Sequence, residues 1–207
     1  MTAYFRAQAL ALRSFVRGPF RTQLRHAAIA FAALLVLSYG AGRLFPKIAA
    51  SAVEFYMSLL ESGGAVSDGQ ISMPGIFANN LRAGALCVLY GIIPYIQLPA
   101  LPLGVNSIMM GFLGAYYVNN GKSLLAYASG IVPHGILELP ALILSIAGGL
   151  YLCRAVTERL RSGQAGLVKT AFGELARVFL LWILPLFLAA AAVEVYITPG
   201  VFALFAG

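Results

Sequence analysis

Hydrophobic residues in this chain occur in long, nearly uncharged runs that are separated by shorter polar connections. The runs cover residues 27–45, 76–97, 98–118, 123–153 and 176–197. A helix needs about 20 apolar residues to cross the hydrocarbon core of a bilayer, and these runs are of that order or longer. The pattern predicts an all-α protein: a polytopic membrane helical bundle of about five transmembrane helices, forming a single membrane domain over residues 1–207.

The fourth run is too long for one straight crossing. As a single helix, residues 123–153 would extend about 46 Å, whereas the hydrocarbon core is about 30 Å thick. Ser129 and Gly130 precede Pro133, and proline is tolerated in the first turn of a helix. We therefore predict a short helix over residues 123–130, a break, and a spanning helix from Pro133 to Cys153, so that the fourth segment is broken or kinked.

The polar connections indicate an orientation. Only 10% of the residues are charged, against about 25% in soluble domains, which implies that most of the surface faces lipid. Basic residues concentrate in residues 1–25 and 154–175, whereas the connection 47–75 is mainly acidic. Because basic connections favour the cytoplasmic side, we predict a cytoplasmic N-terminus, a cytoplasmic loop over 154–175, an outer loop over 47–75 and a C-terminus outside.

The first 25 residues carry arginines mostly at spacings of four and seven, which gathers them along one helical face. This pattern is typical of an amphipathic helix lying on an anionic membrane surface, here interrupted at Gly18-Pro19. The net charge of +7 is concentrated beside hydrophobic runs. The partner that it predicts is therefore a lipid bilayer with anionic headgroups, and not a nucleic acid.

Two further residue types bear on cofactors and assembly. Cys87 and Cys153 lie within or at the end of apolar runs without paired spacing, so we expect small core residues and neither a disulfide nor a metal site. No cofactor is expected. Glycines along the second and third runs allow close helix contact, either within the chain or in a homodimer.

Several polar residues interrupt the apolar runs, and the predicted topology brings all but one of them toward the outer leaflet. The set is Asn79, Asn80 and Arg82 in the second run, His134 and Glu138 in the fourth, Glu194 in the last, and Asn106, which enters the third run from the inner side. An ionisable residue in a membrane helix costs roughly 2.5–3.5 kcal/mol on insertion scales, so these groups should share partners. We expect Arg82 to pair with Glu138 or Glu194, and His134 to hydrogen-bond to one of these carboxylates.

Three stretches of the chain carry a family resemblance. PHGILELPAL (residues 133–142), FANNLRAG (77–84) and AAVEVYITP (191–199) resemble the stage II sporulation protein M family, and with the number and spacing of the spans the resemblance covers nearly the whole chain. The family's motif residues map onto Pro133, His134, Gly135, Glu138, Glu194, Thr198 and Pro199. One departure is Asn106-Ser107, where members often have Asn-Gly.

The resemblance implies a component of a cell-envelope complex in the bacterial cytoplasmic (inner) membrane. In spore formers the namesake works with peptidoglycan-degrading partners and is not itself the hydrolase. The first hypothesis is therefore a non-enzymatic scaffold that recruits or anchors envelope-remodelling membrane or envelope proteins, with a structural polar cluster.

Two other hypotheses remain open. A transporter or channel-like protein would use Glu138, Glu194 and His134 as protonatable or ion-binding groups, as buried ionisable residues do in transport sites. An intramembrane metal hydrolase would use His134 and Glu138, four residues apart, as metal ligands, with Glu194 as a third ligand. The spacing alone is a common one, so no metal site is expected.

Overall fold

The computed structural model describes residues 2–62 and 72–205, and within these ranges the chain is helical without strands. The predicted all-α class is therefore confirmed. The helices are α1 (Thr2–Arg17), α2 (Arg21–Leu44), α3 (Pro46–Ser62), α4 (Met73–Leu89), α5 (Ala100–Asn119), α6 (Leu124–Ser162), α7 (Leu167–Val178), α8 (Leu184–Tyr196) and α9 (Thr198–Ala203). A 3-10 turn, η1 (Tyr90–Ile92), follows α4, and a π-helical segment, η2 (Phe179–Ile183), joins α7 to α8.

Four helical segments of the described chain are long and apolar enough to cross a membrane: α2, α5, α6 and the continuous stretch Leu167–Tyr196. This number is one below the five spans predicted. The difference lies in the predicted span 76–97, which is the 17-residue helix α4 followed by η1. Together α4 and η1 extend about 31 Å, close to the thickness of the hydrocarbon core, but the last residues of the predicted span form a turn.

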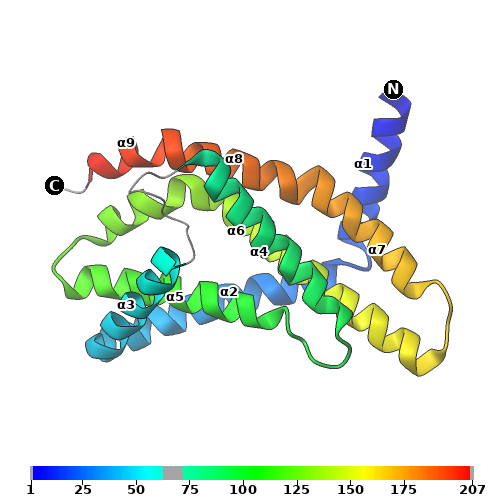
Figure 1. Cartoon of the computed structure of the whole chain (residues 1–207), viewed down its shortest axis with the longest axis horizontal. Coiled ribbons are helices and arrows are strands. Elements are labelled where there is room, and N and C mark those ends of the chain that lie inside the picture. Colours follow the sequence, from blue (N-terminus) through cyan, green and yellow to red (C-terminus); the bar gives the residue numbers. More distant parts are fainter. Residues whose placement is uncertain (1, 63–71, 206–207) are drawn as a thin grey trace.

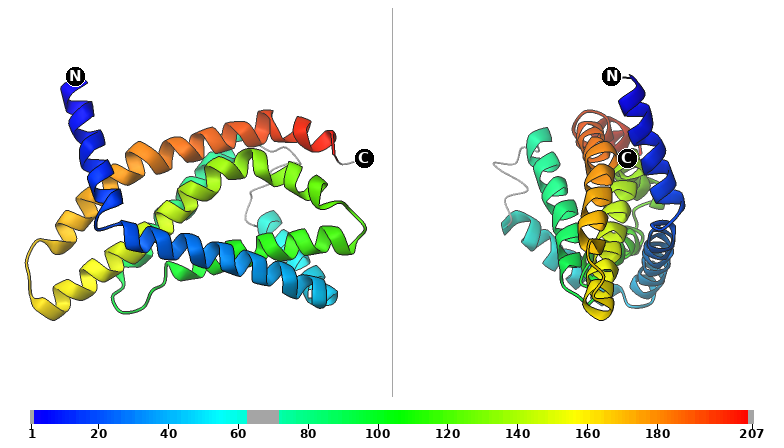
Figure 2. Two further views of the ribbon diagram at one scale, coloured as in Figure 1. Left: turned by 180° about the vertical axis from the view of Figure 1, so that it is seen from behind. Right: turned by 90° about the vertical axis from the view of Figure 1, so that its right-hand side faces the viewer.

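Helix α6 runs through the middle of the bundle (Figure 1) and packs against α2, α4, α5, α7, α8 and α9. On one side α2 lies along α5, and on the other side α8 lies along α6 (Figure 2). Helices α2 and α5 are in close contact, and a Cβ added to Gly111 would lie only 2.0 Å from Ser38 Oγ. Small residues at such positions let membrane helices approach until their backbones touch.

The predicted break in the fourth segment is wrong. Helix α6 is continuous from Leu124 to Ser162, with Pro133 and Pro140 inside it. Neighbouring helices and local adjustment can compensate for the hydrogen bonds that proline removes from a membrane helix. The helix changes direction part way along its length (Figure 1), so the alternative of a kinked segment holds. This bend accommodates the length of the fourth segment, as does the continuation of the helix into the polar sequence that follows residue 153.

Polar connections that were predicted as loops are largely helical. Helix α3 occupies most of the described part of the predicted outer loop 47–75, of which residues 63–71 lie outside the described residues. In the predicted loop 154–175, α6 ends at Ser162 and α7 begins at Leu167. Helix α7 buries Ala171, Leu175 and Val178, spaced for one helical face. The predicted interruption at Gly18-Pro19 is confirmed, since α1 ends at Arg17 and α2 begins at Arg21.

Helix α4 and the turn η1 that follows it cross α6 with almost no space between the backbones. A Cβ on Gly91 would lie 2.2 Å from the carbonyl oxygen of Gly149, and a Cβ on Gly149 would lie 2.1 Å from that of Cys87. Cys87 and Cys153 are both buried and free, as predicted from their positions in the sequence. This crossing fixes the height of α4 against α6, and with it the position of Asn80 relative to the polar part of α6.

Candidate functional site

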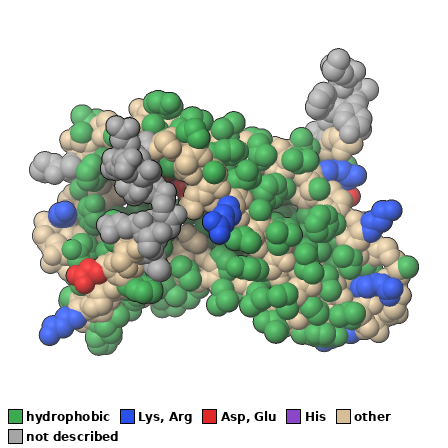
Figure 3. Space-filling model, in the orientation of Figure 1, with side chains coloured by type: hydrophobic (Ala, Val, Ile, Leu, Met, Phe, Trp, Pro, Cys, Tyr) green, Lys and Arg blue, Asp and Glu red, His purple; other side chains and the backbone are tan. Residues whose placement is uncertain are grey.

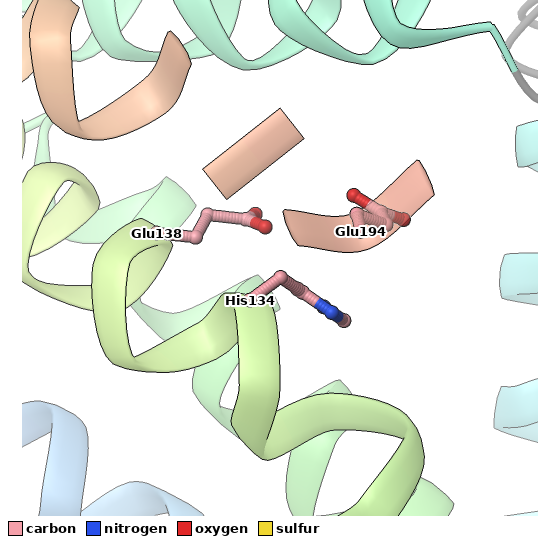
Figure 4. Close-up of side chains that lie close together, drawn as sticks. All are labelled: His134, Glu138 and Glu194. Carbon is pink, nitrogen blue, oxygen red and sulfur yellow. The ribbon is translucent and has the colours of Figure 1, made fainter. Parts of the chain in front are cut away.

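Three ionisable side chains meet between α6 and α8. Two of them are four residues apart in the sequence, and the third lies far from both. His134 and Glu138 project from successive turns of α6, and Glu194 faces them from α8 (Figure 4). One ligand atom from each residue can be chosen so that all three atoms lie within 4.8 Å of one another, and all three residues are half-buried. Two carboxylates this close inside a membrane protein repel each other unless a proton or a cation lies between them. We call these three residues the polar cluster.

Thr198 lies between the ring of His134 and the backbone of α8. The Thr198 hydroxyl donates to the carbonyl oxygen of Val193 at 3.2 Å, and the same oxygen lies 3.2 Å from His134 Nδ1. When the single proton of the hydroxyl is directed at Val193, the oxygen is free to accept from an Nδ1–H of His134. In that arrangement a neutral His134 carries its proton on Nδ1 and its lone pair on Nε2.

The polar cluster adjoins a cavity of about 230 Å³ between α3, α5 and α6, which His134, Glu138, Tyr56 and Asn106 help to line. Asn106 donates to the Pro102 carbonyl at 2.8 Å, within its own helix. Burial raises the pKa of the Tyr56 phenol, and the nearby Glu138 carboxylate raises it further, so this hydroxyl keeps its proton. The cavity gives a small ion or a water molecule room beside the cluster.

Asn80 of α4 lies close to the Glu138 carboxylate. Its Nδ2 atom is buried and has no hydrogen-bond partner among the described residues. A buried amide nitrogen without a partner is costly, so a small rotation toward the carboxylate would be favourable. The neighbouring Asn79 is exposed and lies away from the cluster. Of the predicted asparagine pair, the structure therefore brings one member to the site.

The predicted pairing of Arg82 does not form in this structure. Arg82 is exposed, and the one ion pair in the described part of the chain joins Arg177 to Glu174, at 2.7 Å on α7. The hydrogen bond of His134 is likewise to Thr198 and not to a carboxylate. The sequence placed Arg82 at the outer end of the second span, whereas it lies in the middle of α4 and is exposed.

The other motif residues differ in burial. Gly135 is buried, Pro133 is half-buried, and Pro199 is exposed in the first turn of α9. Further along the same face of α6, the small residues Ala141, Ser145, Gly148 and Gly149 are buried. The cluster therefore stands at one end of a tightly packed helix face.

A second polar site, which the sequence did not reveal, lies at the opposite end of α6. A cavity of about 550 Å³ is lined by residues of α2, α6 and the turn before α5, including Gln23, Tyr95, Arg154, Thr157 and Arg161. Gln23 is only 8% exposed, and its Oε1 atom has no hydrogen-bond partner among the described residues. The spacing of Arg154, Thr157 and Arg161 on one helix face was the signal that could have indicated it.

Tyr95, which lines this second cavity, has an unusual backbone conformation. Its φ of 64° is in the left-handed region, which a tyrosine rarely occupies. The Tyr95 N–H donates to Thr157 Oγ1 at 3.1 Å, and the guanidinium of Arg161 lies 5.4 Å from the centre of the Tyr95 ring. A backbone strain held by such contacts is often found at functional sites.

A known protein family matches most of the chain. The family model described as stage II sporulation protein M matches residues 26–199. The chain belongs to this family. The matched region of this stage II sporulation protein M family member contains the whole polar cluster, Thr198 and the α4–α6 crossing. Comparisons with curated proteins and with solved structures gave no match.

Proposed function

We propose that this family member is a non-enzymatic component of the bacterial inner membrane that recruits or anchors envelope-remodelling partner proteins. The observation that supports it is the assembly of two basic segments, distant in sequence, at one end of the molecule. Figure 3 shows hydrophobic side chains over most of one face and several Lys and Arg side chains near the end where α7 begins. Such a surface suits an acidic segment of another protein.

The N-terminal basic segment is packed on the bundle, so the basic end has a defined shape. Phe20 is fully buried and stacks on Phe15, with ring centres 5.2 Å apart. Both rings contact Tyr151 of α6 edge-on, at 5.2 and 6.0 Å. The aromatic contact attaches the end of α1 to α6, close to the cavity lined by Arg154 and Arg161. A docking surface built from ordered helices loses less entropy on binding than a solvated tail would.

In the proposed orientation α4 and η1 cross the membrane as a fifth span. This basic end then lies in the cytoplasm, with the N-terminus, and the C-terminus lies outside. Anionic lipid headgroups would neutralise the arginines that face the membrane. The cavity at Arg154, Arg161 and Gln23 would take the acidic side chains of the partner protein. The membrane-spanning helices would anchor the partner protein at the membrane.

Site-specific photocrosslinking in cells tests the proposal. A photoreactive residue replaces Glu158, which lines the cavity and is exposed, and the adducts are compared with those from the same residue at Lys47 on α3. We expect a discrete adduct with another protein from position 158 that is lost in the double variant Arg154→Gln, Arg161→Gln and retained in Lys47→Gln. Adducts with lipid alone, or with a second copy of this chain alone, would contradict recruitment of a partner at this surface.

A second candidate function, transport of protons or small cations, is favoured by one observation. The polar cluster combines three ionisable side chains with an adjoining cavity of about 230 Å³. Ionisable residues inside membrane bundles commonly mark ion pathways. Ion or proton flux into liposomes containing the purified protein, abolished by Glu138→Gln, would support this function. Flux no greater than in protein-free liposomes would rule it out.

A further inference from the structure

The polar cluster has the donor set of a transition-metal site. It offers one imidazole nitrogen and two carboxylates from two helices, within 4.8 Å of one another. Imidazole suits zinc and neighbouring first-row ions, whereas magnesium and calcium prefer oxygen ligands alone. Three protein ligands also match the number found in zinc sites that keep one coordination position open.

The hydrogen bond to Thr198 prepares His134 for this role. Metal-binding histidines commonly donate their second N–H to a carboxylate, carbonyl or water, which fixes the ring and its tautomer. Here Nδ1 lies 3.2 Å from the Thr198 hydroxyl oxygen, and this hydroxyl lies 3.2 Å from the Val193 carbonyl oxygen. An Nδ1–H that donates to Thr198 would leave the lone pair on Nε2 for a metal ion. This contact is independent of the distances within the cluster.

Charge at the site also calls for a cation. The described residues supply no lysine or arginine within ion-pairing distance of Glu138 or Glu194. Two carboxylates that face each other without a basic partner need either a shared proton or a bound ion. A shared proton would satisfy the two acids but would not involve His134, which has a ligand atom within 4.8 Å of both. A divalent ion satisfies all three groups together.

The geometry requires little movement to close around an ion. In a tetrahedral zinc site with ligand distances of about 2.1 Å, the ligand atoms lie about 3.4 Å apart. The donors here lie within 4.8 Å of one another, so each would move by about 1 Å or less. The cavity of about 230 Å³ lined by His134 and Glu138 gives the ion a place from which to enter. Asn80, beside Glu138, is available to hold that carboxylate.

We propose that His134, Glu138 and Glu194 bind one divalent transition-metal ion of the zinc type, which ties α8 to α6. The metal joins the C-terminal end of the chain to its longest helix. This site is separate from the basic end at which partners are proposed to dock, so the two proposals can fail independently.

Metal titration of the full chain tests the proposal. The protein, purified in detergent with a tag free of histidine, is stripped with a chelator and titrated with Zn²⁺, Mn²⁺ or Mg²⁺. Elemental analysis gives the bound metal per chain, and thermal unfolding reports stabilisation by the ion. We expect one Zn²⁺ per chain, weaker Mn²⁺ binding, no Mg²⁺ binding at the same concentrations, and a Tm that rises with Zn²⁺.

Matched variants locate the ion. Glu138→Gln and Glu194→Gln should each weaken Zn²⁺ binding by at least about 10-fold, and Thr198→Val by about 10-fold through loss of the hydrogen bond to His134. Glu54→Gln, an exposed acid on α3, should leave binding unchanged. Wild-type protein that takes up no stoichiometric Zn²⁺ would overturn the proposal without need of any variant. Equal Zn²⁺ affinity in wild type, Glu138→Gln and Glu194→Gln would overturn it as well.

Discussion

Replacing Gly149 with alanine tests the crossing of α4 and α6 that positions the polar cluster. The new Cβ would lie 2.1 Å from the Cys87 carbonyl oxygen and 2.6 Å from Cγ of Pro99. The first is backbone, and Pro99 is a rigid, fully buried ring, so neither can rotate away. Relief of the clash requires the two helices to separate by about 1 Å, and overpacking of this kind costs typically about 1–3 kcal/mol.

The adjacent Gly148 provides a matched control on the same helix. A Cβ there would meet Leu175 Cδ2, the end of a flexible side chain, at 3.3 Å, and Val88 Cγ2 at the ordinary van der Waals distance of 3.5 Å. Glycine is about 0.8–1.0 kcal/mol worse than alanine inside a helix, so Gly148→Ala should be neutral or slightly stabilising. Both substitutions raise helix propensity by the same amount, so the difference between the stabilities of the two variants measures the cost of the clash.

Thermal unfolding of the purified protein in detergent measures that difference. For a chain of this size, a gap of about 2 kcal/mol corresponds to about 4–8 °C in Tm. We expect Gly149→Ala to unfold below wild type and Gly148→Ala at or above it. If the two variants unfolded within about 1 °C of each other, the backbones of α4 and α6 would not be in contact at this point, and the position assigned to Asn80 would lose its support.

Two further predictions concern stability away from the cluster. Tyr127→Phe removes a hydrogen bond from the phenol to the Met110 carbonyl, 2.7 Å long, and should lower the free energy of unfolding by about 0.6–1.7 kcal/mol. Steric trapping in bicelles would measure this, and an unchanged value would show that the bond does not contribute. Gly163, with φ of 70°, ends α6, so Gly163→Ala should destabilise by about 1 kcal/mol. Gly173→Ala, within α7 and with no atom within 4 Å of the new Cβ, should stabilise instead; the same sign for both in thermal unfolding would contradict the left-handed cap.

The sequence was sufficient to predict the class of fold because lipid imposes a simple rule. Every backbone polar group inside a bilayer must be bonded within the protein, so long apolar runs indicate helices. The same rule explains why the prediction at Pro133 was wrong. In water, proline breaks a helix because the backbone carbonyl that it leaves without a hydrogen bond, and the chain that follows, can bond to other groups. In the membrane, where neighbouring helices cover the backbone, α6 stays continuous and bends instead.

The polar cluster was predictable in part. His134 and Glu138 lie four residues apart, so a helix necessarily places them on one face. Glu194 could be placed at the same height from the order of the spans, but its contact with α6 depends on how α8 is rotated. The direction of a side chain is also what made the prediction for Arg82 fail, since this residue is exposed on α4. Spacing along a helix fixes height, whereas the direction of a side chain depends on packing between helices.

Segment η2 sets the rotation of α8. Buried positions 171, 175 and 178 on α7 follow the α-helical period, which would continue at 182, yet Trp182 is exposed and Ile183 is buried. The buried face then continues at 187 and 190, and Glu194 follows in the same phase. One residue in an α-helix corresponds to about 100° of rotation, so the wide turn shifts the phase of everything after it by that angle. The number of residues between α7 and α8, more than their identity, thus decides that a carboxylate faces His134.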